Sequence, residues 1–167
     1  WLNASSATIY VHSETQLNTE QNGIIGDDFS MNICKNWESE FFQKEMKNVR
    51  KVSLRTSIVM GNKGGAFPKL MQISRVGLGG IQGKGNQFVS WIHIDDFCNA
   101  VDFIINNEQL ENAVNVTAPN PLRNFDMMKI IRDKIKMPVG ISSPTWLLEL
   151  ASIFMQTETE FLLKSRN

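Results

Sequence analysis

A short stretch in the second half of the chain places a histidine two residues before a pair of carboxylates. His93 precedes Asp95 and Asp96, and a carboxylate beside an imidazole can orient the ring for general acid–base chemistry. The other interpretation is structural: the histidine satisfies backbone groups near a sheet edge while the aspartates stabilise a helix N-terminus. The structural interpretation is the favoured one.

The chain contains one tyrosine, which limits its acid–base chemistry. Tyr10 follows an apolar and then small-residue segment. Tyr10 either places its hydroxyl in a cleft or packs on the loop that follows.

Eight of the 11 glycines lie between residues 61 and 85, where they permit positive φ angles and a mobile loop. Polar side chains there, from Arg75, Gln82, Lys84 and Gln87, can face an anionic or hydroxylated ligand. The alternative is a solvated, hairpin-like loop with ordinary turn glycines. The residues predicted to lie on the substrate side of a cleft are Gln82, Gln87, Trp91 and His93.

Alternating strands and helices must position these residues. Phe29, Ile33, Trp37 and Phe41 recur every fourth residue and predict an amphipathic helix over residues 29–46. Strands are expected over residues 1–10 (opening into a loop), 52–61, 89–94 and 114–116, and further helices over 67–76, 95–105, 125–136 and 144–155. This alternation favours an α/β domain with a mainly parallel sheet.

Composition excludes several classes of function. The 17 basic and 17 acidic side chains balance, which argues against a nucleic-acid or polyanion partner. Cys34 and Cys98 have neither metal-ligand spacing nor a disulfide pattern, so we expect no metal and a reducing, cytoplasmic location. No apolar run approaches the ~20 residues of a membrane span, so no membrane partner is expected.

Three segments occur in an order typical of one enzyme superfamily. They are Ala4-Ser5-Ser6-Ala7-Thr8-Ile9-Tyr10, Leu54-Arg55-Thr56-Ser57-Ile58-Val59-Met60-Gly61 and Trp91-Ile92-His93-Ile94-Asp95-Asp96. Their order resembles that of the extended short-chain dehydrogenases/reductases. The chain is more narrowly similar to an atypical epimerase-family branch, whose members are named sugar-nucleotide epimerases. The motifs that carry this narrower resemblance lie at residues 77–80, 83–87, 90–96, 118–121, 157–160 and 163–166.

The resemblance implies a partial Rossmann-type α/β domain. Members of the family begin with a strand, a glycine-rich turn and a helix that hold the dinucleotide pyrophosphate. No Gly-x-x-Gly-x-x-Gly follows any predicted strand here. We therefore expect residues 1–137 to be the later part of an NAD(P)-binding domain, and residues 138–167 a truncated, mostly helical C-terminal segment. Such a fragment is expected to expose sheet edge and apolar surface.

The resemblance also assigns a catalytic serine but no acid–base pair. In the superfamily a serine polarises the substrate, a tyrosine transfers the proton, and a lysine four residues later lowers the tyrosine pKa. Ser6 matches this serine. The alternative interpretation is that Ser6 is only a small residue, needed where the strand meets the cofactor. If Glu38 marks the acidic position of the catalytic helix, Ser30 and Cys34 occupy the tyrosine and lysine positions. Glu38 is expected to make a structural or ribose-side hydrogen bond.

The implied cofactor is NADP or NAD, with NADP favoured, together with an unidentified small-molecule substrate. Ser57, Ile58 and Val59 end a strand, where ligands of such sheets bind; otherwise they are simply a buried strand end. The predicted cofactor-binding residues are Ser5, Ser6, Tyr10, Glu38, Ser57, Ile58 and Val59. The implied function is that of an epimerase/dehydratase-like oxidoreductase acting on a sugar nucleotide. The alternatives are a non-catalytic dinucleotide-binding or sensing protein and a structural remnant that binds nothing.

Overall fold

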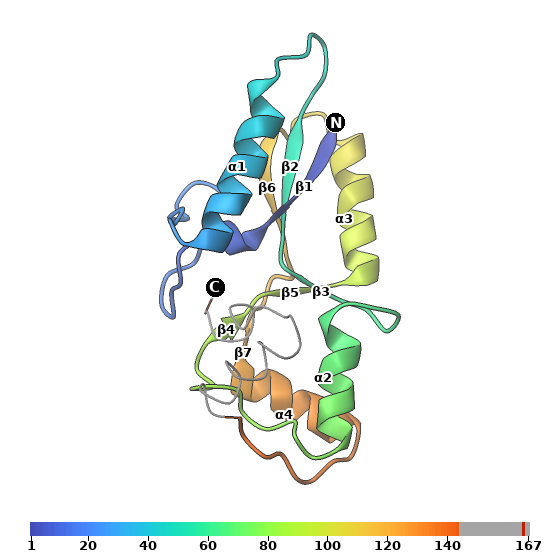
Figure 1. Ribbon diagram of the computed structural model, residues 1–167. Helices are drawn as coiled ribbons and strands as arrows, with labels where there is room; N and C mark the ends of the chain where they lie inside the picture. The colour runs from blue at the N-terminus through green and yellow to red at the C-terminus, as the bar shows by residue number, and fades with distance from the viewer. Residues whose placement is uncertain (144–164, 166–167) are drawn as a thin grey trace.

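A three-stranded parallel sheet forms the centre of the upper lobe in Figure 1. A computed structural model describes residues 1–143 and residue 165. In it the sheet has the order β1-β2-β6, with strands β1 (Leu2–Ser6), β2 (Val52–Thr56) and β6 (Asn112–Val116). Helix α1 (Phe29–Gln43) covers one face and helix α3 (Ile94–Asn106) the other. The expected α/β class with a parallel sheet is confirmed.

A second lobe lies below this sheet in Figure 1. Its antiparallel pair β4–β7 and the parallel pair β3–β5 are accompanied by two helices. Met60, Leu70 and Met128 are among the buried residues that form its core. The remaining elements within residues 1–143 are η1 (Ala7–Ile9), β3 (Ile58–Met60), α2 (Ala66–Arg75), β4 (Phe88–Val89), β5 (Trp91–His93), β7 (Leu122–Arg123) and α4 (Asn124–Lys134).

Two strands predicted as continuous are interrupted where the lobes meet. The strand expected over residues 52–61 divides at Ser57, whose amide donates to the carbonyl oxygen of Val116, while the Ile58 amide donates to that of Ser90. The strand expected over residues 89–94 divides at Ser90, and α3 already begins at Ile94. Each strand changes its hydrogen-bonding partner at the break, a long-range event that local alternation does not encode.

The two faces of the upper sheet have different chemistry. Side chains alternate along β2, so Val52 and Leu54 pack in the apolar cluster that contains Ile104 of α3. Ser53 and Arg55 face the opposite side and bond to α1. Both sets are buried, as expected for a parallel strand covered on both faces.

Helix α1 buries a different face from the one predicted. Phe29 and Trp37 are 76% and 52% exposed, although their spacing predicted that they face the core. The buried face instead includes Cys34 and Glu38, one position further along the helix. Phe41 is buried as predicted. The reason is that Glu38 is drawn to a charged partner on β2, described below, and this fixes the rotation of the helix.

Two adjacent cations before β2 bind the C-termini of the two covering helices. Arg50 donates to the carbonyl oxygens of Ile104 and Ile105 at the end of α3. Lys51 donates to those of Phe41 and Lys44 at the end of α1. Positive charge at a helix C-terminus opposes its negative dipole end, so one dipeptide anchors both helices to the central strand.

Residues after the expected boundary at 137 pair with the glycine-rich loop. The Ile141 amide donates to the carbonyl oxygen of Gly77, and the Gly80 amide donates to that of Ile141. A Cβ atom at Gly80 would lie 2.4 Å from the Ile141 carbonyl group, closer than any side chain can approach. The helix expected over 144–155 and the motif at 157–160 lie outside the described residues.

We predict that Gly80→Ala lowers the free energy of unfolding by about 1–3 kcal/mol, because the added methyl group forces the 141–143 segment away. The matched control is Gly64→Ala, since nothing lies within 4 Å of a Cβ atom there. That control should change stability by less than about 1 kcal/mol. Chemical denaturation of both variants measures the difference, and equal stabilities would contradict the packing of residues 141–143 on this loop.

Candidate functional site

The carboxyl ends of the three parallel strands align along one edge of the upper sheet. Ser6 lies opposite Thr56, which lies opposite Val116. Ser57 follows directly and is half-buried, and its hydroxyl donates to the Val116 carbonyl oxygen at 3.2 Å. Ligands of open α/β sheets bind outside this edge. The structure therefore brings together two of the predicted residues, Ser6 and Ser57, on neighbouring strands.

The Ser6 hydroxyl is oriented by the turn that follows β1. Ser6 is the N-cap of η1, where its Oγ accepts a hydrogen bond from the Thr8 amide at 3.2 Å. The same hydroxyl donates to Thr8 Oγ1 at 2.9 Å. Ser6 remains partly exposed, so it can exchange the Thr8 hydroxyl for a carbonyl or hydroxyl oxygen of a ligand while retaining its cap.

Behind this edge, a buried ion pair joins α1 to β2. Arg55 Nε lies 2.9 Å from Glu38 Oε1 and Arg55 Nη2 lies 2.7 Å from Glu38 Oε2, so the pair is bidentate. Both residues are less than 10% exposed. Ser5 and Ser53 donate their hydroxyls to Glu38 Oε1 at 2.7 and 3.2 Å. Both carboxylate oxygens of Glu38 are thus engaged inside the protein, a structural hydrogen-bonding role.

Charge and burial act in opposite directions on this pair. Burial alone raises the pKa of Glu38, but hydrogen bonds from Arg55 and Ser5 and the positive charge of Arg55 outweigh it, leaving the pKa below its ordinary value. The hydrogen bond to Glu38 outweighs burial at Arg55 and raises the pKa of the guanidinium. Glu38 and Arg55 are therefore both charged at neutral pH.

Tyr10 completes the same network. Its hydroxyl accepts a hydrogen bond from Arg55 Nη1 at 2.8 Å and donates to Asn115 Oδ1 at 2.9 Å. Tyr10 is 2% exposed, and its backbone bridges to Ile25 in the loop that follows. Of the two interpretations of Tyr10, this geometry is that of packing on the following loop.

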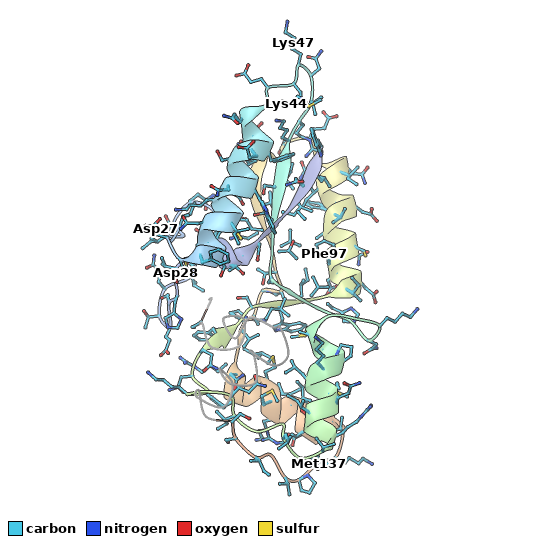
Figure 2. All side chains as sticks on the ribbon, in the orientation of Figure 1. Asp27, Asp28, Lys44, Lys47, Phe97 and Met137 are labelled. Carbon is cyan, nitrogen blue, oxygen red and sulfur yellow. The ribbon has the colours of Figure 1, made fainter. Side chains whose placement is uncertain are left out.

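Asn115 extends the network to that loop. Its amide side chain donates to the carbonyl oxygen of Asn18, and its backbone amide donates to the Glu20 carboxylate. Residues 11–28 lie beside the N-terminal end of α1 (Figure 2, where Asp27 and Asp28 mark the end of this loop). A continuous set of polar contacts therefore runs from α1 through β2 to β6 and the loop.

Ser30, Cys34 and Glu38 share the buried face of α1. They are spaced four residues apart, as the hypothesis for the helix register requires, and Cys34 packs against Ile9 and Tyr10. The face that meets the end of β1 therefore carries a hydroxyl, a thiol and a carboxylate. Neither a tyrosine nor a lysine of α1 occupies it.

Gln82 and Gln87, predicted on the substrate side, are buried within their own loop. They are 2% and 3% exposed, so the solvated-loop interpretation is wrong for both. Asn124 accepts from the Gln82 amide and donates to Gln82 Oε1, while Gln87 Nε2 donates to the Gln82 carbonyl oxygen. These bonds fix the loop to the start of α4. Arg75 and Lys84 are exposed.

His93 and Trp91 lie at the start of α3 and in the lower core respectively. His93 is the N-cap, and its Nδ1 accepts from the Asp95 amide at 3.2 Å. Asp95 and Asp96 fill the first helical turn, which is the geometry of the structural interpretation. Trp91 packs against the core of the second lobe, and its buried Nε1 has no hydrogen-bonding partner among the described residues.

Residues 1–143 and 165 were searched for a metal-binding cluster and for a membrane-spanning helix. No three His, Cys, Asp or Glu side chains there are grouped so as to hold a metal ion. No helix in the same part of the chain combines the length and apolar character needed to cross a membrane.

Arg55 and Asn115 were not singled out from the sequence, although each is central to a polar network. A signal for Arg55 does exist. A charge inside an alternating strand of a buried parallel sheet requires a partner of opposite charge, and Glu38 is one of the two acidic residues on the helix before it. Asn115 carries no comparable local signal.

The fold and this edge define a Rossmann-type α/β protein. No family model matches the chain. A chloroplastic epimerase family protein SDR39U1 homolog of Arabidopsis thaliana is 30% identical over 148 residues, which is 89% of this chain and 42% of the relative. The Bacillus subtilis epimerase family protein YfhF is 30% identical over 150 residues, or 90% of this chain and 49% of the relative. The chain thus spans about half the length of the curated relatives it matches.

Solved structures give the same result. Human epimerase family protein SDR39U1 (isoform 2), crystallised with NADPH, superimposes with a TM-score of 0.88 at 26% identity, over 99% of this chain and 55% of that chain. A nucleoside-diphosphate sugar epimerase of Corynebacterium glutamicum superimposes with a TM-score of 0.71 at 26% identity, over 98% of this chain and 38% of that chain. In sequence and in fold the chain is thus similar to the epimerase-family branch of the extended short-chain dehydrogenases/reductases.

We predict that Arg55→Met lowers the free energy of unfolding by about 3–5 kcal/mol, because it leaves the Glu38 carboxylate buried without its charged partner. Arg75→Met, which removes an exposed guanidinium, is the control and should cost less than about 0.5 kcal/mol. Urea denaturation measures both. A loss below about 1 kcal/mol for Arg55→Met would show that the ion pair is not needed to anchor α1.

The lowered pKa of Glu38 also predicts a pH dependence. In the unfolded protein the Glu38 carboxylate takes up a proton near its ordinary pKa of 4.5, whereas in the folded protein its pKa is lower. Between these two pKa values the folded protein therefore carries fewer protons than the unfolded protein. Stability therefore falls as the pH drops from 4.5 through the folded pKa. In Glu38→Gln this part of the acid-induced loss should be absent.

Thermal unfolding measured from pH 6 to pH 3 tests this dependence. Glu40→Gln, which removes an exposed carboxylate from the same helix, is the matched control and should keep the acid-dependent loss. Parallel curves for the wild type and Glu38→Gln across the whole range would contradict the assignment.

Proposed function

We propose that this chain supplies the later part of an NAD(P)-dependent, epimerase/dehydratase-like oxidoreductase. The observation that carries the proposal is the match at TM-score 0.88 to a human protein crystallised with NADPH, combined with hydroxyl side chains at the carboxyl edge of the sheet. NADP is favoured over NAD because of that neighbour. A sugar nucleotide is the favoured substrate, since the Corynebacterium protein is described as a nucleoside-diphosphate sugar epimerase.

Ser6 is the proposed catalytic residue. Its half-exposed hydroxyl, oriented by Thr8, can donate a hydrogen bond to a substrate carbonyl oxygen and so stabilise the negative charge that develops there. The cofactor supplies hydride transfer when bound. Ser57, Ile58 and Val59 are proposed to approach its nicotinamide end, largely through backbone groups at the strand break.

Ser5, Tyr10 and Glu38 are proposed to support the cofactor site indirectly, by positioning the end of β1. All three are buried. Ser5 donates to Glu38, and Arg55 donates to both Glu38 and Tyr10, so the network holds the end of β1 at a fixed position. Gln82 and Gln87 shape the substrate side in the same indirect way, while Trp91 and His93 line the junction of the lobes. Residues 1–137 are proposed to hold this machinery, and residues 138–167 to belong to a C-terminal segment.

The relatives are about twice as long as this chain. We propose that a region equivalent to their remaining length supplies the glycine-rich turn for the pyrophosphate. The second candidate function is non-catalytic dinucleotide binding or sensing. It is favoured by the Tyr10 hydroxyl, which is buried between Arg55 and Asn115 and so is removed from proton transfer with a substrate.

Titration of the full-length polypeptide with NADPH, followed by nicotinamide fluorescence, tests both functions. We predict that NADPH binds saturably and that Ser6→Ala changes its dissociation constant by less than about threefold, because Ser6 contributes chiefly in the transition state. Ser39→Ala, an exposed serine on α1, is the control.

A screen for hydride exchange with sugar nucleotides and carbonyl compounds then separates the candidates. Turnover that falls by about 100-fold or more in Ser6→Ala would support the enzyme. Binding without turnover would support the sensor, and absence of NADPH binding would exclude both.

A further inference from the structure

A buried threonine lies two residues after Ser6, in the turn that ends β1. Thr8 is 6% exposed and belongs to η1. Among the residues that the structure describes, its hydroxyl bonds to the Ser6 hydroxyl alone, at 2.9 Å. Burying a hydroxyl costs free energy unless a hydrogen bond compensates for the lost water. The compensating partner is the residue proposed above to be catalytic, so the reason for a hydroxyl at Thr8 lies in Ser6.

Thr8 contacts the Ser6 oxygen through two groups. The Thr8 amide donates to Ser6 Oγ at 3.2 Å, and Thr8 Oγ1 lies 2.9 Å from the same atom. A serine hydroxyl carries one proton and two lone pairs. In the ligand-free protein the Ser6 proton bonds to Thr8 Oγ1. When a ligand oxygen takes this proton as its hydrogen bond, the Thr8 hydroxyl can donate to the second lone pair of Ser6 Oγ.

The turn that carries Thr8 is fixed by its surroundings. The next two residues, Ile9 and Tyr10, are 1% and 2% exposed, and they form a core cluster with Cys34 of α1. Ser6, in contrast, is partly exposed at the carboxyl edge of the sheet. A buried neighbour in a fixed turn therefore sets the direction of a hydroxyl that is open to a ligand.

We propose that Thr8 is the positioning residue for Ser6. Its amide and hydroxyl occupy the two lone pairs of Ser6 Oγ, so that the Ser6 proton is directed at a substrate oxygen. A hydroxyl that accepts hydrogen bonds is a stronger donor, which favours the negative charge that develops on that oxygen. This role rests on the proposed function and adds to it the residue that orients the catalytic hydroxyl.

A conservative pair of variants tests the role in the full-length polypeptide. Thr8→Val removes the hydroxyl and keeps the amide, so kcat should fall about tenfold, less than for Ser6→Ala, while KM changes by less than about threefold. Thr8→Ser keeps a hydroxyl and should restore kcat to within about threefold of the wild type. The probes are UDP-galactose with NADP, and phenanthrenequinone, a reactive dicarbonyl compound, with NADPH.

Thr19→Val is the matched control. Thr19 is half-buried, and its hydroxyl accepts from the Asn22 amide in a turn of the following loop. This variant should lower the midpoint of thermal unfolding and leave kcat unchanged. Thr8→Val should keep the midpoint within about 2 °C of the wild type, because the partly exposed Ser6 can bond to water instead. Lower stability with unchanged kcat in Thr8→Val would overturn the proposal.

Proton exchange of the Ser6 hydroxyl gives a measurement that needs neither cofactor nor substrate. The isotope shift of the Ser6 Cβ signal in mixed light and heavy water reports this exchange. Because the Ser6 proton is held by Thr8, exchange should be at least about tenfold faster in Thr8→Val and unchanged in Thr19→Val. Equal exchange in Thr8→Val and the wild type would overturn the role of Thr8.

The two measurements distinguish this proposal from the proposed function. If the wild type binds no NADPH and turns over neither probe, the proposed function is wrong and the positioning role falls with it. If the wild type turns over a probe and Thr8→Val has the same kcat, the positioning role alone is wrong. If the wild type binds NADPH but turns over neither probe, the exchange of the Ser6 hydroxyl decides: faster exchange in Thr8→Val supports the proposal and equal exchange overturns it.

Discussion

The bidentate ion pair between Glu38 and Arg55 is the interaction on which the upper lobe depends. A buried charge is tolerated only when it is paired and hydrogen-bonded, and here the guanidinium and the carboxylate satisfy each other with Ser5, Ser53 and Tyr10 completing the set. Because Glu38 is on α1 and Arg55 on β2, the pair fixes both the position and the rotation of the helix.

The rotation of α1 illustrates how the competing energies balance. Turning the helix by one residue would bury Phe29 and Trp37, a gain of about 1.5–3 kcal/mol for each full burial of a large apolar side chain. Met31 and Cys34 would leave the core in exchange, which cancels much of that gain. Separating Glu38 from Arg55 would cost about 3–5 kcal/mol. The ion pair therefore outweighs the aromatic stripe, and two large side chains remain in solvent.

The same pair determines which hydroxyls are left for chemistry. Tyr10 is fixed between Arg55 and Asn115 and holds the loop at residues 11–28 against the sheet. Ser5 is committed to Glu38, whereas Ser6, its neighbour on the other side of the strand, is bonded only within its own turn and is partly exposed. A strand end with one committed and one available serine follows from the alternation of side chains along β1.

The parallel sheet and the four helices of the described region could be predicted from the sequence, because apolar periodicity and turn residues are local signals. The buried face of α1 could not, since the stripes containing Phe29 and Cys34 differ by one residue. The choice between them depends on a partner 17 positions away.

The burial of Gln82 and Gln87 was likewise hidden, because their partner Asn124 is about 40 residues distant. Ser57 was predicted at the carboxyl end of a strand, where ligands of such sheets bind, whereas Ser6 was assigned from the family resemblance. The resemblance to the family gave their proposed roles, which the geometry of the edge accommodates.

A double-mutant cycle between Glu38→Gln and Arg55→Met is the most direct test of this account. If the ion pair anchors α1, the two substitutions together should destabilise the protein by at least about 1.5 kcal/mol less than the sum of the single losses, as expected for side chains in direct contact. Losses that add to within about 0.5 kcal/mol would show that Glu38 and Arg55 act independently. The rotation of α1 and the position of Tyr10 would then require another cause.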